Sequence, residues 1–169
     1  MKNKISLIII AVLCTFLVTS QVKSPSDFLG YKMGERFTPH HQLVNYFQHV
    51  AAASTNVKLE KYGETYENRP LYTAIISSPK NFKNLDNIRK NHLNPTNMNG
   101  DGFKDDGIAI VWLSYGVHGN ESVSSEVSMK ILFDLVDPNH KKSKKWLENT
   151  VVIIDPCLNP DGRERYVNW

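Results

Sequence analysis

The sequence has 169 residues, of which 41% are hydrophobic and 22% are charged, so its length and composition suit one globular domain with a substantial core. The formal net charge is +3 and falls to +1 once Lys2 and Lys4 are set aside with the N-terminal segment, which excludes the basic surface of a nucleic-acid-binding protein. Outside that segment Cys157 is the single cysteine, which excludes a disulfide scaffold.

Residues 1–20 have the pattern of a secretory signal peptide. Lys2 and Lys4 precede an apolar run from Ile5 to Val18, which is shorter than the roughly 20 residues of a spanning helix. A retained membrane anchor is the alternative. We expect cleavage, a secreted or periplasmic protein, and no stable membrane association afterwards. Residues 21–37 would then form a leader into a domain that spans residues 38–169.

Three histidines lie on the first helix that the sequence predicts. The pair Thr38-Pro39 has the form of an N-cap followed by proline at the first helical position, and the helix should run to about residue 53. His40 and His41 are neighbours, so their side chains point about 100° apart and do not face one ligand together. We expect both of them, and His49, to face solvent.

A β-hairpin and a short helix follow. Residues Val57–Gly63 and Leu71–Ser77 read as two strands joined by a polar turn, and residues 85–92 as a helix. Residues 94–107 are polar and rich in glycine. Their Asn and Asp spacing resembles a calcium-binding EF-hand loop, but Ile108 replaces the bidentate Glu and a strand follows, so we predict a plain surface loop.

An apolar strand, a tight turn and a helix form the centre of the sequence. The strand, at residues 108–115, is apolar enough to be buried on both faces. Gly116 and Gly119 bracket the turn, and Asn120 is the expected N-cap. The helix should end at Asp137-Pro138. Its apolar stripe consists of Val123, Val127, Ile131 and Leu135, backed by Leu132 and Val136.

The last third of the chain predicts a helix, a strand and a turn. The helix lies around Trp146 and Leu147, with the basic run Lys141–Lys145 on its solvated side. The strand, at residues 151–154, should be buried. The segment Asn159-Pro160-Asp161-Gly162 consists of residues that favour a tight turn, and this turn would shape the floor of a site. This order of elements predicts an α/β fold.

His118 and Glu121 are the candidate metal ligands. They follow the central strand, at the edge of the sheet where ligand sites form in α/β proteins. Imidazole nitrogen and carboxylate oxygen both bind zinc at about 2.0–2.2 Å, and two histidines with one glutamate form a known catalytic set. The bare pattern also fits structural roles, with a turn histidine and a carboxylate on the helix dipole.

Three segments, in order, resemble the zinc carboxypeptidase family. They are Val57–Leu71, similar to the family's opening hairpin, then Val117–Glu121 after an apolar strand, then Asn159–Gly162 after a second apolar strand. The resemblance covers roughly residues 38–169. It implies a mixed β-sheet flanked by helices, truncated here after about four strands, with His118 and Glu121 as the first two zinc ligands.

The resemblance also implies an activity. We expect a secreted zinc metallocarboxypeptidase that hydrolyses the C-terminal bonds of peptides or proteins with zinc-activated water. In this family the third ligand, the general base and the carboxylate-binding arginines lie downstream of the Asn-Pro-Asp-Gly turn, so these 169 residues alone should be inactive and prone to aggregate. The alternatives are a zinc amidohydrolase or deacylase of related fold, or an inactive binding domain.

Several polar residues near this pattern are weaker candidates. His140 and His92 should lie about 20 Å or more from Glu121, too far to complete the metal site. Arg163 and Arg165 are expected as surface or salt-bridge residues rather than substrate clamps. Asn120 departs from the arginine that some family members carry at this position, which leaves open whether the substrate is a peptide C-terminus.

Overall fold

The computed structural model describes residues 21–93 and 107–169. The predicted signal peptide and residues 94–106 of the predicted polar loop lie outside the described residues. Within them, the helices are α2 (Pro25–Leu29), α3 (His40–Ala53), α4 (Pro79–Phe82), α5 (Leu85–Leu93), α6 (Ser122–Val136), α7 (Lys141–Glu148) and α8 (Pro160–Val167). None of these helices combines the length and the apolar character that crossing a membrane requires.

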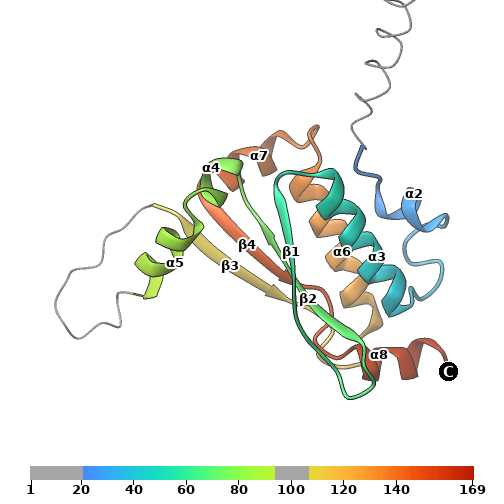
Figure 1. Ribbon diagram of the computed structural model, residues 1–169. Helices are drawn as coiled ribbons and strands as arrows, with labels where there is room; N and C mark the ends of the chain where they lie inside the picture. Colours follow the sequence, from blue (N-terminus) through green and yellow to red (C-terminus); the bar gives the residue numbers. More distant parts are fainter. Residues whose placement is uncertain (1–20, 94–106) are drawn as a thin grey trace, which may run out of the picture.

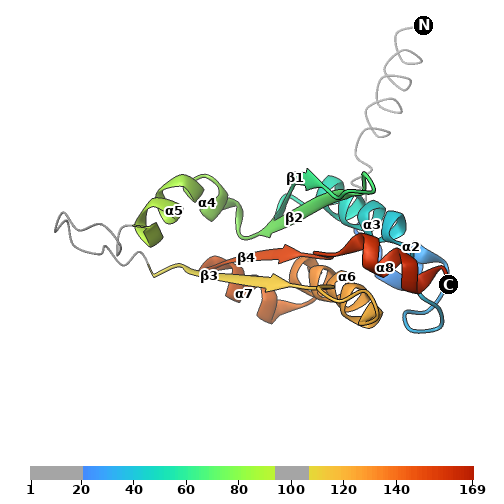
Figure 2. The same cartoon turned by 90° about the horizontal axis from the view of Figure 1, so that it is seen from below.

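Four strands form one mixed sheet in the order β1-β2-β4-β3 (Figure 1). Strands β1 (Val57–Glu64) and β2 (Pro70–Ile76) form the predicted antiparallel hairpin, with a register shift between Lys61 and Gly63. Strand β4 (Thr150–Asp155) pairs antiparallel with β2 and parallel with β3 (Ala109–Ser114). The predicted mixed sheet is therefore confirmed, and β1 and β3 are its two edges (Figure 2).

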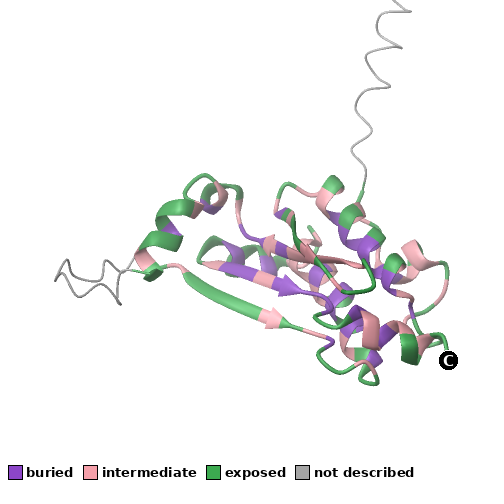
Figure 3. Ribbon diagram, turned by 60° about the horizontal axis from the view of Figure 1, so that its bottom comes forward, coloured by how far each residue is buried: buried purple, intermediate pink, exposed green. Residues whose placement is uncertain are grey.

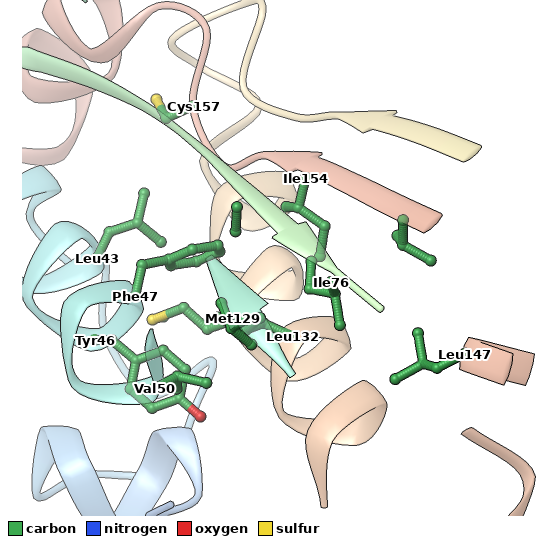
Figure 4. Close-up of a cluster of buried hydrophobic side chains, with 13 residues drawn as sticks. Leu43, Tyr46, Phe47, Val50, Ile76, Met129, Leu132, Leu147, Ile154 and Cys157 are labelled. Atoms are coloured by element: carbon green, nitrogen blue, oxygen red, sulfur yellow. The ribbon is translucent and has the colours of Figure 1, made fainter. Parts of the chain in front are cut away.

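Helices α3 and α6 pack against one face of this sheet and enclose the core. Phe47 and Val50 of α3 meet Met129 and Leu132 of α6 beside Ile154 of β4 (Figure 4). The predicted leader contributes to the same packing, since Phe28 of α2 contacts Tyr46 edge to face at 5.2 Å between ring centroids. Burial of this apolar surface is the main favourable term that holds α3 and α6 on the sheet.

Strand β3 is exposed, and the prediction that it is buried on both faces is wrong for the described structure. Ile110, Val111 and Trp112 are 37%, 40% and 65% exposed. Most of the strand has the colour of exposed residues in Figure 3. The cause is topological: β3 is an edge strand, and the described helices leave it uncovered. An edge strand that is apolar and open is a site of self-association.

The apolar stripe predicted for α6 is also displaced. Val123 and Val127 are exposed, while Ser125, Met129 and Leu132 are buried. The helix begins one residue later than expected, with Glu121 rather than Asn120 at the N-cap position. Ile131 and Leu135 still pack against the core, so the buried face is rotated rather than reversed.

The helix that carries three histidines departs from the prediction at three positions. Pro39, not Thr38, occupies the N-cap position of α3, and no side chain caps this end of the helix. The Thr38 backbone N–H donates to Glu126 Oε1 at 2.7 Å. His40 is buried rather than solvent-facing: its Nε2 donates to the Pro70 carbonyl at 3.1 Å, and burial lowers its pKa. His41 is exposed as predicted, whereas His49 is half-buried.

Candidate metal-binding site

Two loops meet at the end of the sheet where the parallel strands β3 and β4 have their C-termini. Strands β3 and β4 are parallel, with Ser114 opposite Asp155 at their ends. The segment after β3 carries His118 and Glu121 to the start of α6, and the segment after β4 leads through Asn159 into α8. Because both segments leave the sheet at the same edge, they lie against each other, as ligand-binding loops do in α/β folds.

His118 and Glu121 come together at this edge. His118 Nδ1 lies 3.3 Å from Glu121 Oε2, and the two side chains are 71% and 60% exposed. Two donors that each lie about 2.1 Å from a tetrahedral ion are about 3.4 Å apart, so the observed separation fits a shared zinc ion. The Glu121 backbone N–H donates to the His118 carbonyl at 3.1 Å, which closes the turn between them.

The segment after β4 holds the backbone just before His118. The N–H groups of Leu158 and Asn159 donate to the carbonyls of Tyr115 and Gly116, at 2.9 and 3.0 Å. The Asn159 side chain then donates from Nδ2 to the Val117 carbonyl at 3.1 Å. The segment after β4 thus donates hydrogen bonds to three successive carbonyls, those of Tyr115, Gly116 and Val117.

Asn159 has a second role as the N-cap of α8. Its Oδ1 accepts a hydrogen bond from the Gly162 backbone N–H at 2.9 Å, and Pro160 occupies the first helical position. The predicted Asn-Pro-Asp-Gly turn is therefore also the start of a helix, in addition to the turn expected there. The sequence signal was present, because Asn followed by Pro is a helix-start pattern.

Glycine is required where the two loops touch. A Cβ atom built on Gly119 would lie 2.1 Å from both the carbonyl carbon and the oxygen of Gly162. Gly116 adopts φ 66°, and a Cβ there would lie 2.5 Å from Ser125 Oγ. The loop that carries His118 therefore rests directly on the backbone of the first turn of α8.

Arg163 lies beneath the loop in a buried ion pair with Glu126, so of the two expected roles, surface residue or salt bridge, it takes the salt bridge. Its guanidinium donates through Nη1 to the Ser122 carbonyl and through Nη2 to the Thr38 carbonyl, the latter at 2.7 Å. Nη2 also lies 3.5 Å from Glu126 Oε1. Arg165 does lie at the surface, in a 2.5 Å ion pair with Glu67.

The β-hairpin is tied to the same turn. Asp161 Oδ1 accepts hydrogen bonds from Thr65 Oγ1 at 2.7 Å and from Arg69 Nη1 at 2.6 Å. The pKa of Arg69 is raised, chiefly by its hydrogen bond to Glu67 and then by its bond to Asp161. These contacts place the hairpin tip beside the start of α8.

A buried carboxylate ends β4 close to these loops. Asp155 Oδ2 accepts a hydrogen bond from the Tyr62 hydroxyl at 2.6 Å, and Oδ1 accepts one from the Cys157 backbone N–H at 3.3 Å. Burial raises the pKa of Asp155, and these hydrogen bonds partly offset the rise. Asp155 was not singled out in the sequence, because its burial depends on the pairing of β4 with both neighbours.

The described residues bring two candidate ligands together, and among them no group of three or more His, Cys, Asp or Glu side chains could hold a metal ion. His140 and His92 take part in other contacts. His140 Nδ1 lies 2.5 Å from Ser143 Oγ, and His92 Nε2 lies 2.7 Å from the Ile108 carbonyl.

Several known proteins are similar to this chain. The zinc carboxypeptidase family matches residues 43–168. Carboxypeptidase O of Bos taurus is 22% identical over 148 residues, which are 86% of this chain and 33% of that protein. Probable carboxypeptidase 2 of Trichophyton verrucosum is 42% identical over 52 residues, which are 31% of this chain and 10% of that protein.

A solved structure shares the fold. Carboxypeptidase A from Helicoverpa armigera superposes with a TM-score of 0.58 at 19% identity, over 97% of this chain and 35% of that one. The chain thus spans about a third or less of the relatives that it matches. The family match covers most of its residues, and the chain belongs to the zinc carboxypeptidase family.

Proposed function

We propose that residues 38–169 form the N-terminal part of the catalytic domain of a zinc-dependent carboxypeptidase, with His118 and Glu121 as two of its zinc ligands. The separation of 3.3 Å between His118 Nδ1 and Glu121 Oε2 is the observation that carries this proposal, since it suits two donors on one tetrahedral ion. Their exposure supports it, because both side chains can be reached by an ion and by substrate.

Each of the two side chains would bind the metal ion in one particular protonation state. His118 Nδ1 can bind a cation only when it carries no proton, so the neutral imidazole would keep its proton on Nε2. Glu121 would contribute Oε2 as a carboxylate. A bound zinc ion lowers the pKa of water and polarises a carbonyl. The third ligand and the general base would come from outside the described residues.

The substrates would be peptide or protein C-termini. Family membership supports this class of substrate. A zinc amidohydrolase or deacylase of related fold remains the second candidate, because Asn120 stands where some family members have arginine. A third candidate, a binding domain without turnover, applies to the 169 residues taken alone.

Activity assays on the full-length protein separate these candidates. We expect release of C-terminal amino acids from peptides, loss of this activity on treatment with 1,10-phenanthroline, and recovery on addition of zinc. Release of acyl groups from N-acylated amino acids with no cleavage of peptides would favour the deacylase. No hydrolysis of either class by zinc-loaded protein would favour a binding domain.

Export is a separate part of the proposal. The basic residues and apolar run of residues 1–20 suggest a cleaved signal peptide and a secreted or periplasmic enzyme. N-terminal sequencing of the protein recovered from its native host would test this. A mature N-terminus near residue 21 is expected, and a mature protein that retains Met1 and the apolar run would contradict it.

A further inference from the structure

We propose that Asn159 and Arg163 are positioning residues that set the geometry of the His118 and Glu121 pair through the backbone on either side of it. This inference rests on the proposed function, in which these two side chains bind zinc. It assigns a role to the N-cap and first turn of α8 that the sequence of this segment alone does not reveal.

The two side chains hold the two ends of the ligand segment. The Val117 carbonyl, directly before His118, accepts a hydrogen bond from Asn159 Nδ2 at 3.1 Å. The Ser122 carbonyl, directly after Glu121, accepts one from Arg163 Nη1. Both donors come from one short stretch of chain, so the ends of the segment are fixed relative to each other.

The middle of the segment rests on the same stretch. Gly119 lies so close to the peptide group that joins Gly162 to Arg163 that a Cβ on Gly119 would meet the Gly162 carbonyl at 2.1 Å. The side chains of His118 and Glu121 are mostly exposed to solvent and lie 3.3 Å from each other. Their positions therefore depend on where the backbone beneath them is held.

Arg163 can serve as a fixed anchor because it is itself held rigidly. Its side chain is 1% exposed and also donates to the Thr38 carbonyl at 2.7 Å, while Glu126 provides the opposite charge. A guanidinium presents several donors in one plane, so it can bond two carbonyls at once, which a lysine ammonium at this place could not do with the same geometry.

Asn159 allows the positioning role to be separated from a structural role. Its Oδ1 caps α8 by accepting from Gly162, and its Nδ2 holds Val117. The Asn159→Asp change keeps an oxygen for the cap, since Asp is a good N-cap residue. The same change replaces the donor to Val117 with a carboxylate oxygen, which repels the carbonyl.

The experiment measures Co²⁺ affinity of the full-length protein by absorption titration, together with its melting temperature. For Asn159→Asp we expect binding at least about 10-fold weaker, the size of effect seen when groups that orient metal ligands are removed. The melting temperature should stay within a few degrees of wild type. Asn139→Asp makes the same charge change in the turn before α7, far from the site, and should bind Co²⁺ as wild type does.

Each outcome has a distinct meaning. Asn159→Asp with wild-type Co²⁺ affinity would overturn the positioning role, whatever its melting temperature. Equal losses of affinity in Asn159→Asp and Asn139→Asp would also overturn it, because the effect would then be one of net charge. If the wild-type protein bound no Co²⁺, the proposed function itself would fail. Arg163→Lys gives an independent check: it should bind Co²⁺ more weakly while keeping the charge opposite Glu126.

Discussion

Arg163 of α8 and Glu126 of α6 form an ion pair in the interior of the molecule, 3.5 Å apart and with side chains only 1% and 7% exposed. The pair joins the helix that follows β4 to the helix that follows the candidate metal loop. Glu126 Oε1 also accepts a hydrogen bond from the Thr38 backbone N–H, so the segment before α3 is drawn into the same cluster. The cluster fixes how three separate parts of the chain meet beneath the site.

Arg163→Met should destabilise the protein by about 3–5 kcal/mol, because it leaves the Glu126 carboxylate buried without its counter-charge. Urea unfolding followed by circular dichroism measures the change. Arg165→Met is the matched control: Arg165 pairs with Glu67 at the surface, its side chain is 76% exposed, and the expected loss is about 0–1 kcal/mol. Equal losses in the two variants would contradict the structural importance of the buried pair.

Gly119→Ala should destabilise the protein by about 1–3 kcal/mol or more, because the new methyl group meets backbone atoms of Gly162 that cannot move independently. The control is Gly63→Ala, where the added Cβ would meet Leu71 Cδ1 at an ordinary 3.9 Å. We expect the control to stay within about 0.5 kcal/mol of wild type. A Gly119→Ala protein as stable as Gly63→Ala would show that the two loops are not in close contact.

His40 should make stability depend on pH. Burial lowers its pKa in the folded state, while in the unfolded chain the pKa is near its usual value of about 6.5. The folded protein therefore resists protonation, and stability that is fully present above about pH 6.5 is lost as the pH falls through the folded-state pKa. The free energy of unfolding, measured in urea, should be lower at pH 5 than at pH 7.5.

The His40→Gln variant tests the source of that drop. Glutamine keeps an N–H donor for the Pro70 carbonyl but does not titrate, so its stability should change less between the two pH values. His41→Gln, at the exposed neighbouring position, should follow the wild-type curve. If His40→Gln and wild type lost the same free energy, the pH dependence would arise elsewhere.

The exposed edge of the sheet predicts self-association of these 169 residues expressed alone. Trp112 on β3 is 65% exposed beside Ile110 and Val111, on a strand whose outer edge pairs with no strand of the described residues. Trp112→Lys should raise the monomeric fraction in size-exclusion chromatography with light scattering. Trp146→Lys, on α7 and 54% exposed, should change it little. A monodisperse wild-type chain would contradict this.

Local patterns in the sequence predicted most of the elements and the meeting of His118 with Glu121. The hairpin, α5 and the end of α6 at Val136 follow from short-range spacing and turn residues, as does a pair of ligands three positions apart. The burial of Arg163 could not be foreseen in this way. It depends on Thr38, 125 positions away, and on Glu126, 37 positions away.

The burial of individual side chains was the least predictable feature. The composition of β3 favoured a strand covered on both faces, but coverage depends on which elements lie beside it, and among the described elements β4 alone pairs with it. Similarly, His40 at the start of α3 is buried because Pro70 of β2 lies beside it. Neither relation is encoded in the residues nearby.

The stoichiometry of bound zinc tests the central proposal most directly. The full-length protein is dialysed against zinc-free buffer, and its metal content is measured by mass spectrometry for wild type, His118→Ala and a His140→Ala control. We predict one zinc ion per chain in wild type and in the control, and almost none in His118→Ala, because the ion loses one of its ligands. A His118→Ala protein that keeps one zinc ion per chain would contradict the account.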